Sequence, residues 1–130
     1  MARSRELLMV LDARLVMRTA LVGTIVQLAI AAAQHYSPWF GAHWALFARM
    51  MVSASAGYGY GLVLGRGYAR GALGGAIAGG LCVVPALAIL VVLGDSDATV
   101  MTLGCLIAIG TGGVGGCFGQ MGAVLRRLGL

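Results

Sequence analysis

Charged residues are scarce in this sequence. They make up 10% of its 130 residues, whereas a soluble domain carries roughly 25%, so the chain cannot cover a water-facing surface with charges. A disordered chain is excluded as well, because disordered segments are polar or highly charged and 60% of these residues are hydrophobic. The composition is typical of a polytopic membrane protein, and the length fits one small domain.

The long apolar runs also lack acidic residues, and the cysteines are not arranged in pairs. Only four residues are acidic, and none lies within a long apolar run, although proton-coupled carriers and rotary rings usually need a carboxylate inside a span. No Ser/His/Asp or Cys/His set occurs in these runs, so we expect no enzyme and no cofactor. The three cysteines form no CxxC pair and are expected to be small apolar residues without a disulfide or a metal: Cys82, Cys105 and Cys117.

Apolar runs dominate what is present. Each is near the ~17 to 25 residues that a helix needs to cross the hydrocarbon layer. We therefore predict an all-α integral membrane protein whose transmembrane domain, residues 19–125, has four helices at about 19–36, 45–64, 71–93 and 100–125. Residues 1–18 combine four arginines with leucines at helical spacing, which predicts a short amphipathic helix at the membrane surface. Residues 126–130 are expected to form a cytoplasmic tail.

The basic residues predict the orientation of these helices. All nine are arginines, and the formal net charge is +5. Four crossings place the N-terminus, the turn at residues 66–70 and the C-terminus on one side, together with eight of the nine arginines. The positive-inside rule then predicts cytoplasmic termini, and we expect a bacterial inner membrane. Arginines at the ends of apolar runs are orientation signals, so we expect no nucleic-acid partner.

Glycine is abundant, with 22 residues, and it recurs at intervals of four in the predicted spans. Residues four apart stack on one face of a helix, so these glycines form a groove that another helix backbone can approach, as in glycine-zipper packing. Their number suggests that one subunit does not use every groove, and we expect the others to bind a second copy or another membrane subunit. The candidates for helix packing are Gly57, Gly61, Gly71, Gly75, Gly79, Gly104, Gly112 and Gly116.

Two of the polar side chains within the predicted spans are candidates for a functional site, Arg49 near the start of the second span and Gln27 near the middle of the first. A charge at that depth is a functional candidate, although an arginine near the interface can also extend its guanidinium to the headgroups. Gln27 fits either a hydrogen bond between helices or a contact with a solute. Two acidic residues are predicted on the same side of the membrane, so a solute or ion-pair site is expected from Arg49, Gln27, Asp95 and Asp97.

The segment that connects the first and second predicted spans is rich in aromatic residues. Residues 36–44 include four aromatic side chains of the kind found at headgroup depth. His35 precedes this stretch and His43 lies near its end, and Met50 and Met51 downstream are soft ligands that suit Cu(I). Interfacial polar side chains are one interpretation of the histidines, and a metal or pigment site is the other.

These observations predict a small non-catalytic membrane protein that packs through glycine-rich helix faces. It would act as a homo-oligomer or as an accessory or assembly subunit of a larger membrane complex. The alternative is a small oligomeric channel, transporter or exporter for an ion or a small polar or anionic solute. The expected partners are the lipid bilayer, a second copy and other membrane subunits.

Overall fold

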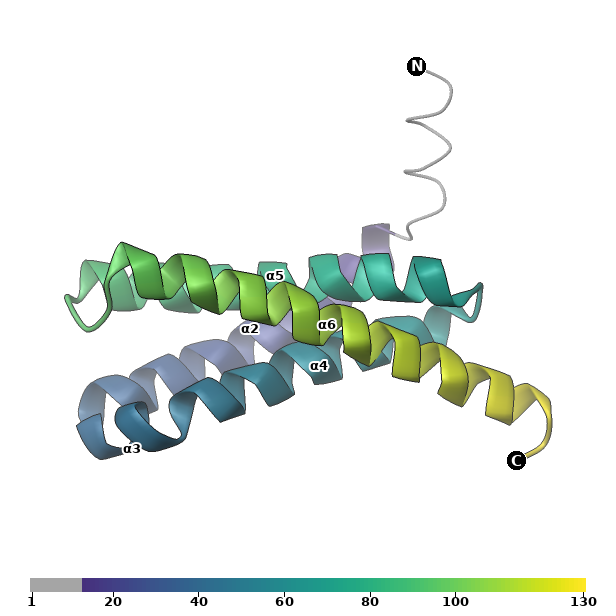
Figure 1. Ribbon diagram of the computed structural model, residues 1–130, viewed down its shortest axis with the longest axis horizontal. Helices are drawn as coiled ribbons and strands as arrows, with labels where there is room; N and C mark the ends of the chain where they lie inside the picture. Colours follow the sequence, from purple (N-terminus) through teal and green to yellow (C-terminus); the bar gives the residue numbers. More distant parts are fainter. Residues whose placement is uncertain (1–12) are drawn as a thin grey trace, which may run out of the picture.

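The computed structural model describes residues 13–130, and every regular element among them is helical (Figure 1). In chain order the helices are α2 (Ala13–Tyr36), α3 (Pro38–His43), α4 (Ala45–Leu64), α5 (Tyr68–Val92) and α6 (Ala98–Arg127). The prediction of an all-helical protein is confirmed over this range.

Capping side chains and glycines mark where the helices begin and end. The Ser37 hydroxyl accepts a hydrogen bond from the backbone N–H of Phe40, and Pro38 opens α3 at a position where a helix makes no use of the N–H that proline lacks. Helix α4 ends at Gly65, whose φ of 58° lies in the left-handed region that glycine tolerates. Asp97 precedes α6 as its N-cap residue, but its side chain makes no capping bond.

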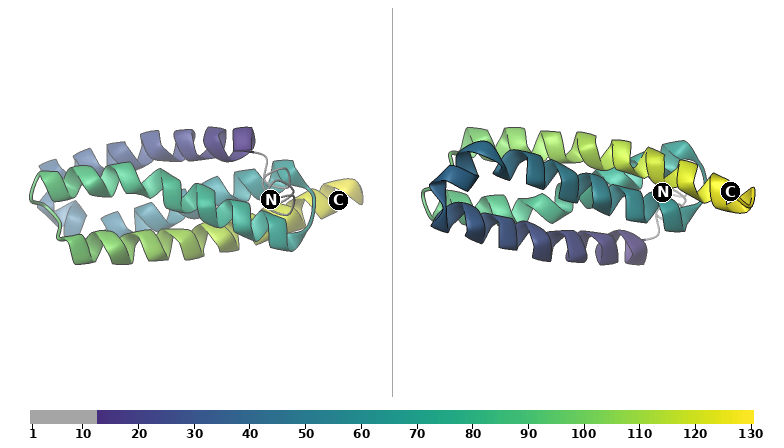
Figure 2. Two further views of the ribbon diagram at one scale, coloured as in Figure 1. Left: turned by 90° about the horizontal axis from the view of Figure 1, so that it is seen from above. Right: turned by 90° about the horizontal axis from the view of Figure 1, so that it is seen from below.

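The four long helices run back and forth along one bundle. The start of α2, the α4–α5 turn and the C-terminus lie at one end, whereas α3 and the α5–α6 turn lie at the other (Figure 1). Helices α4 and α5 pack against each other and against both α2 and α6. Figure 2 shows α2 and α6 on opposite flanks of this central pair. Helix α2 therefore packs mainly against α4 and α5.

Glycine faces meet where α4, α5 and α6 pack together. A Cβ atom at Gly57 or Gly75 would collide with the carbonyl oxygen of Gly112, and one at Gly61 with that of Gly116. Only a residue without a side chain fits such positions, because the space is taken by the backbone of the next helix. The central three helices are therefore in direct backbone contact.

The other candidates for helix packing mostly share this environment. Gly71 and Gly79 also face the backbone of α6, whereas Gly104 faces only the side chain of Leu87. Seven of the eight candidates thus meet backbone atoms of the same chain. These seven positions are filled within the chain, so a contact with a second chain would involve other faces of the helices.

Three of the helices, α2, α5 and α6, are long and apolar enough to cross a membrane. Helix α4 has the predicted bounds and 20 residues, but it is not among the three, because Arg49, two serines and two tyrosines lower its hydropathy. Its polar side chains are largely turned inward: Arg49, Ser53 and Tyr60 are buried. The described residues thus contain three helices with the length and composition of membrane spans, which is consistent with an integral membrane protein.

The ends of the predicted segments differ from the helices in detail. Residues 13–18 belong to α2 and continue into the first apolar run without a break, and the rest of the predicted surface helix lies outside the described residues. Helix α6 extends through Arg127, so the first two residues of the predicted tail are helical. The apolar pattern does not mark these ends, because the helices continue past the apolar residues.

Candidate functional site

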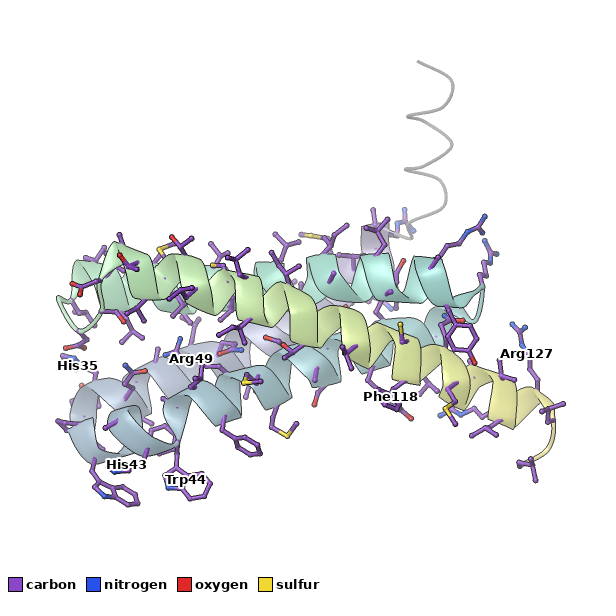
Figure 3. The ribbon with its side chains drawn as sticks, in the orientation of Figure 1. His35, His43, Trp44, Arg49, Phe118 and Arg127 are labelled. Atoms are coloured by element: carbon purple, nitrogen blue, oxygen red, sulfur yellow. The ribbon has the colours of Figure 1, made fainter. Side chains whose placement is uncertain are left out.

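The candidate site is centred on Arg49, four residues after the start of α4. Its side chain is only 7% exposed. One guanidinium nitrogen, Nη2, donates a hydrogen bond of 2.9 Å to the Oε1 atom of Gln34 on α2. The other, Nη1, is buried and has no hydrogen-bond partner among the described residues. Figure 3 shows Arg49 between α4 and the α5–α6 pair, toward the end of the bundle where His35 lies.

A groove of about 270 Å³ lies beside this guanidinium, and residues of α2, α4, α5 and α6 line it. Its polar lining comes from Gln34, Arg49 and Ser96. The rest is apolar or small: Ala45, Leu46, Leu87, Leu90, Val100, Leu103, Gly104 and Ile107. The groove therefore combines a single cationic side chain with an extended aliphatic wall.

Water has little room on the inner side of Arg49. The guanidinium also lines a second void, of only about 10 Å³, together with Met50, Val83 and Ala108. One water molecule needs roughly 10 to 15 Å³, so this void holds one water at most. Neutral Gln34 is the only side chain bonded to the Arg49 guanidinium among residues 13–130.

Gln27 lies in a buried polar layer one helical turn deeper in the bundle. Its Nε2 atom donates to the backbone oxygen of Arg49 at 3.0 Å and lies 3.5 Å from Ser53 Oγ. Ser53 Oγ in turn donates to the backbone oxygen of Gly79 at 3.4 Å and lies 3.8 Å from Cys82 Sγ. Gln27 thus contacts the backbone of Arg49 rather than its guanidinium, and the layer joins α2, α4 and α5.

The two acidic residues of the predicted site do not join Arg49. Asp95 Oδ2 lies 2.6 Å from Nδ1 of His35 and forms an ion pair when that imidazole is protonated. Asp97 occupies the N-cap position of α6. The hydrogen bond to Arg49 that we expected from an aspartate comes from Gln34 instead, because the α5–α6 turn places Asp95 beside the end of α2.

The two histidines have separate partners near one end of the bundle. His43 stacks on Trp39 with ring centroids 5.3 Å apart, and its Nδ1 lies 2.9 Å from the Trp39 backbone oxygen. His35 is paired with Asp95. Within residues 13–130, no group of three or more His, Cys, Asp or Glu side chains could hold a metal ion. Each histidine thus has a protein partner at this end of the bundle.

Two polar residues of the structure were missed as candidates. Gln34 and Ser96 line the groove beside Arg49; each is a polar residue at the border of an apolar run, which is the signal that could have identified them. At the opposite end, Gln120 is 2% exposed and donates from Nε2 to the Gly61 oxygen at 2.7 Å, while its Oε1 accepts from the Gly67 N–H at 3.0 Å. Gln120 thereby holds the α4–α5 turn against α6.

Comparisons with protein-family models, curated proteins and solved structures found no match. The chemistry of the site therefore has to be inferred from its geometry. A planar guanidinium binds carboxylates and phosphates through charge-assisted hydrogen bonds. With an aliphatic wall beside it, the groove can hold a small anion that also has an apolar part.

Proposed function

We propose that this chain is a small, non-catalytic integral membrane protein that binds a small anionic solute at Arg49, as the subunit of a transporter or channel. The observation that carries this proposal is the buried guanidinium of Arg49, with Nη1 unpartnered, beside an apolar groove. Ionisable residues inside membrane-spanning segments are costly and mark solute or ion pathways. An anion in the groove would compensate a charge that Gln34 only solvates.

The groove favours one class of solute. It offers one cationic group, one amide and one hydroxyl, and its remaining lining is aliphatic or glycine. A dianion would be left with an uncompensated charge in apolar surroundings, which is expensive. A monocarboxylate with a short apolar body matches both the charge and the wall.

We propose four crossings with both termini in the cytoplasm of a bacterium, so that Arg49 lies toward the outer face of the inner membrane. The inward burial of Arg49, Ser53 and Tyr60 supports α4 as the fourth span, because the neighbouring helices shield these polar groups from lipid. The arginines of the α4–α5 turn and the C-terminus lie at one end of the bundle (Figure 1). This distribution supports the orientation through the positive-inside rule.

The packed centre of the bundle supports action in an assembly. Backbone contacts at the glycine-rich faces of α4, α5 and α6 leave no room for a continuous solute path through the packed centre of the bundle. A path across the membrane would therefore run between subunits, in a homo-oligomer or beside other membrane proteins. Because most glycine faces are used inside the chain, these contacts would involve the outer faces of the bundle.

A second candidate function is that of an accessory or assembly subunit without a solute. The bond from Arg49 Nη2 to Gln34 Oε1 favours it, because this bond also ties α2 to α4 as a purely structural contact would. In that case the guanidinium has no anion to bind, and a fixed protein partner would accompany the chain during mild purification.

Flux into liposomes separates the two functions. We expect purified protein to admit butyrate and benzoate faster than empty liposomes do, and Arg49→Gln to abolish this flux while the control Arg126→Gln retains it. Arg49→Lys, which keeps the charge, should retain part of the flux. Absence of flux from the correctly folded wild type, or equal flux through Arg49→Gln, would reject the solute-binding function, and a stoichiometric protein partner would then support the accessory role.

A further inference from the structure

A second groove, separate from the Arg49 site, lies between α2 and α4. It measures about 520 Å³. Its floor is formed by Gly23 and Ala56, which are buried, and its walls by apolar side chains that include Val22, Val26 and Val52. This mostly apolar part of the groove fits a hydrocarbon chain.

One end of the groove is charged. Arg18 and Thr19 line it there, next to Gly59 of α4. Arg18 is the last charged residue before an uncharged stretch that extends to residue 48, so it lies where α2 enters the apolar layer. The α4–α5 turn lies at this same end of the bundle (Figure 1) and adds Arg66 and Arg70.

We propose that this groove binds one acyl chain of an anionic phospholipid, with Arg18 contacting the phosphate. Basic residues beside grooves between membrane helices on the cytoplasmic side are a known arrangement for anionic headgroups. The lining extends from Arg18 to Val26 on α2 and from Met51 to Gly59 on α4, eight helical steps on each helix, which corresponds to about 12 Å at 1.5 Å per step. The charge at one end and the apolar wall along the rest match the two parts of a phospholipid.

Gly59 provides a way to block the groove without disturbing the bundle. A Cβ atom there would meet only the Thr19 methyl group, at 3.8 Å, which is ordinary contact distance. A leucine at position 59 would therefore fill the groove near Arg18 while the helices keep their places. Gly110 on α6 is the matched control, because a Cβ atom there meets nothing within 4 Å.

Native mass spectrometry of the purified protein, incubated with dioleoyl phosphatidylglycerol or dioleoyl phosphatidylcholine, tests the proposal. We expect one phosphatidylglycerol per chain to be retained in preference to phosphatidylcholine. Arg18→Gln should weaken this binding about fivefold, as expected for roughly one arginine contact at a membrane surface. Gly59→Leu should remove it, whereas Gly110→Leu and Arg126→Gln should bind as the wild type does.

Three results would overturn the proposal. Equal retention of the two lipids would show that Arg18 does not select an anionic headgroup. Unchanged binding to Gly59→Leu would place the lipid elsewhere on the protein. A wild-type dimer that Gly59→Leu converts to a monomer would show that a second copy, rather than a lipid, occupies the groove.

Discussion

Gly116 lies on α6 where this helix touches both of its central neighbours. A Cβ atom at this position would collide with the carbonyl oxygen of Gly71 on α5, and the Gly116 oxygen itself faces Gly61 on α4. We therefore predict that Gly116→Ala lowers the free energy of unfolding by about 1 to 3 kcal/mol, the usual cost of overpacking a core. Unfolding by denaturant in detergent, followed by circular dichroism, measures this change.

Gly110→Ala on the same helix is the control, because its new methyl group would enter open space. Alanine is favoured over glycine in helices by about 1 kcal/mol, so this variant should be as stable as the wild type or slightly more stable. Equal destabilisation by the two substitutions would mean that the close approach at Gly116 does not contribute to the stability of the bundle.

The four-residue spacing of such glycines places them on one face of each helix, but it does not give the residue that each glycine meets. Gly57 and Gly75 lie on different helices and both meet Gly112, which depends on how each helix is rotated about its own axis. The rotation of a helix about its axis relative to its neighbours could not be predicted from the sequence. For the same reason Gln34 was not recognised as the partner of Arg49, since the two residues lie on separate helices.

At the scale of the helices, the proposal that α4 crosses the membrane is the one to test. It matches the predicted bounds of residues 45–64, yet it is less apolar than the three helices of spanning character. We predict that a cysteine at Tyr36, which is 85% exposed at the end of α2, reacts with a membrane-impermeant maleimide from outside the cell. A cysteine at Arg66, beyond the other end of α4, should react only in inverted vesicles.

The wild type is the control for labelling, because its three cysteines lie within α5 and α6 and should stay unmodified. If cysteines at positions 36 and 66 react from the same side, α4 does not cross the membrane. The orientation and the placement of Arg49 toward the outer face would then both have to be abandoned.

For the whole molecule, composition and hydropathy were sufficient to predict the helical class and the approximate position of each long helix. Contacts between distant segments were harder to predict, because they depend on the order in which helices surround one another. The expected pairing of Arg49 with an aspartate illustrates this: the α5–α6 turn brings Asp95 to His35 instead. The short helix α3 was missed because proline and glycine usually mark a turn, whereas Pro38 here begins a helix that Ser37 caps.

Equilibrium binding of radiolabelled butyrate to the purified protein in detergent tests the central claim, that Arg49 binds a small anion. We predict saturable binding to the wild type and to Arg126→Gln. Binding should be about 10- to 100-fold weaker to Arg49→Gln, because a hydrogen bond to a charged group contributes roughly 1.5 to 3 kcal/mol, and Arg49→Lys should lie between. No saturable binding to the folded wild type, or the same affinity in Arg49→Gln, would contradict the account.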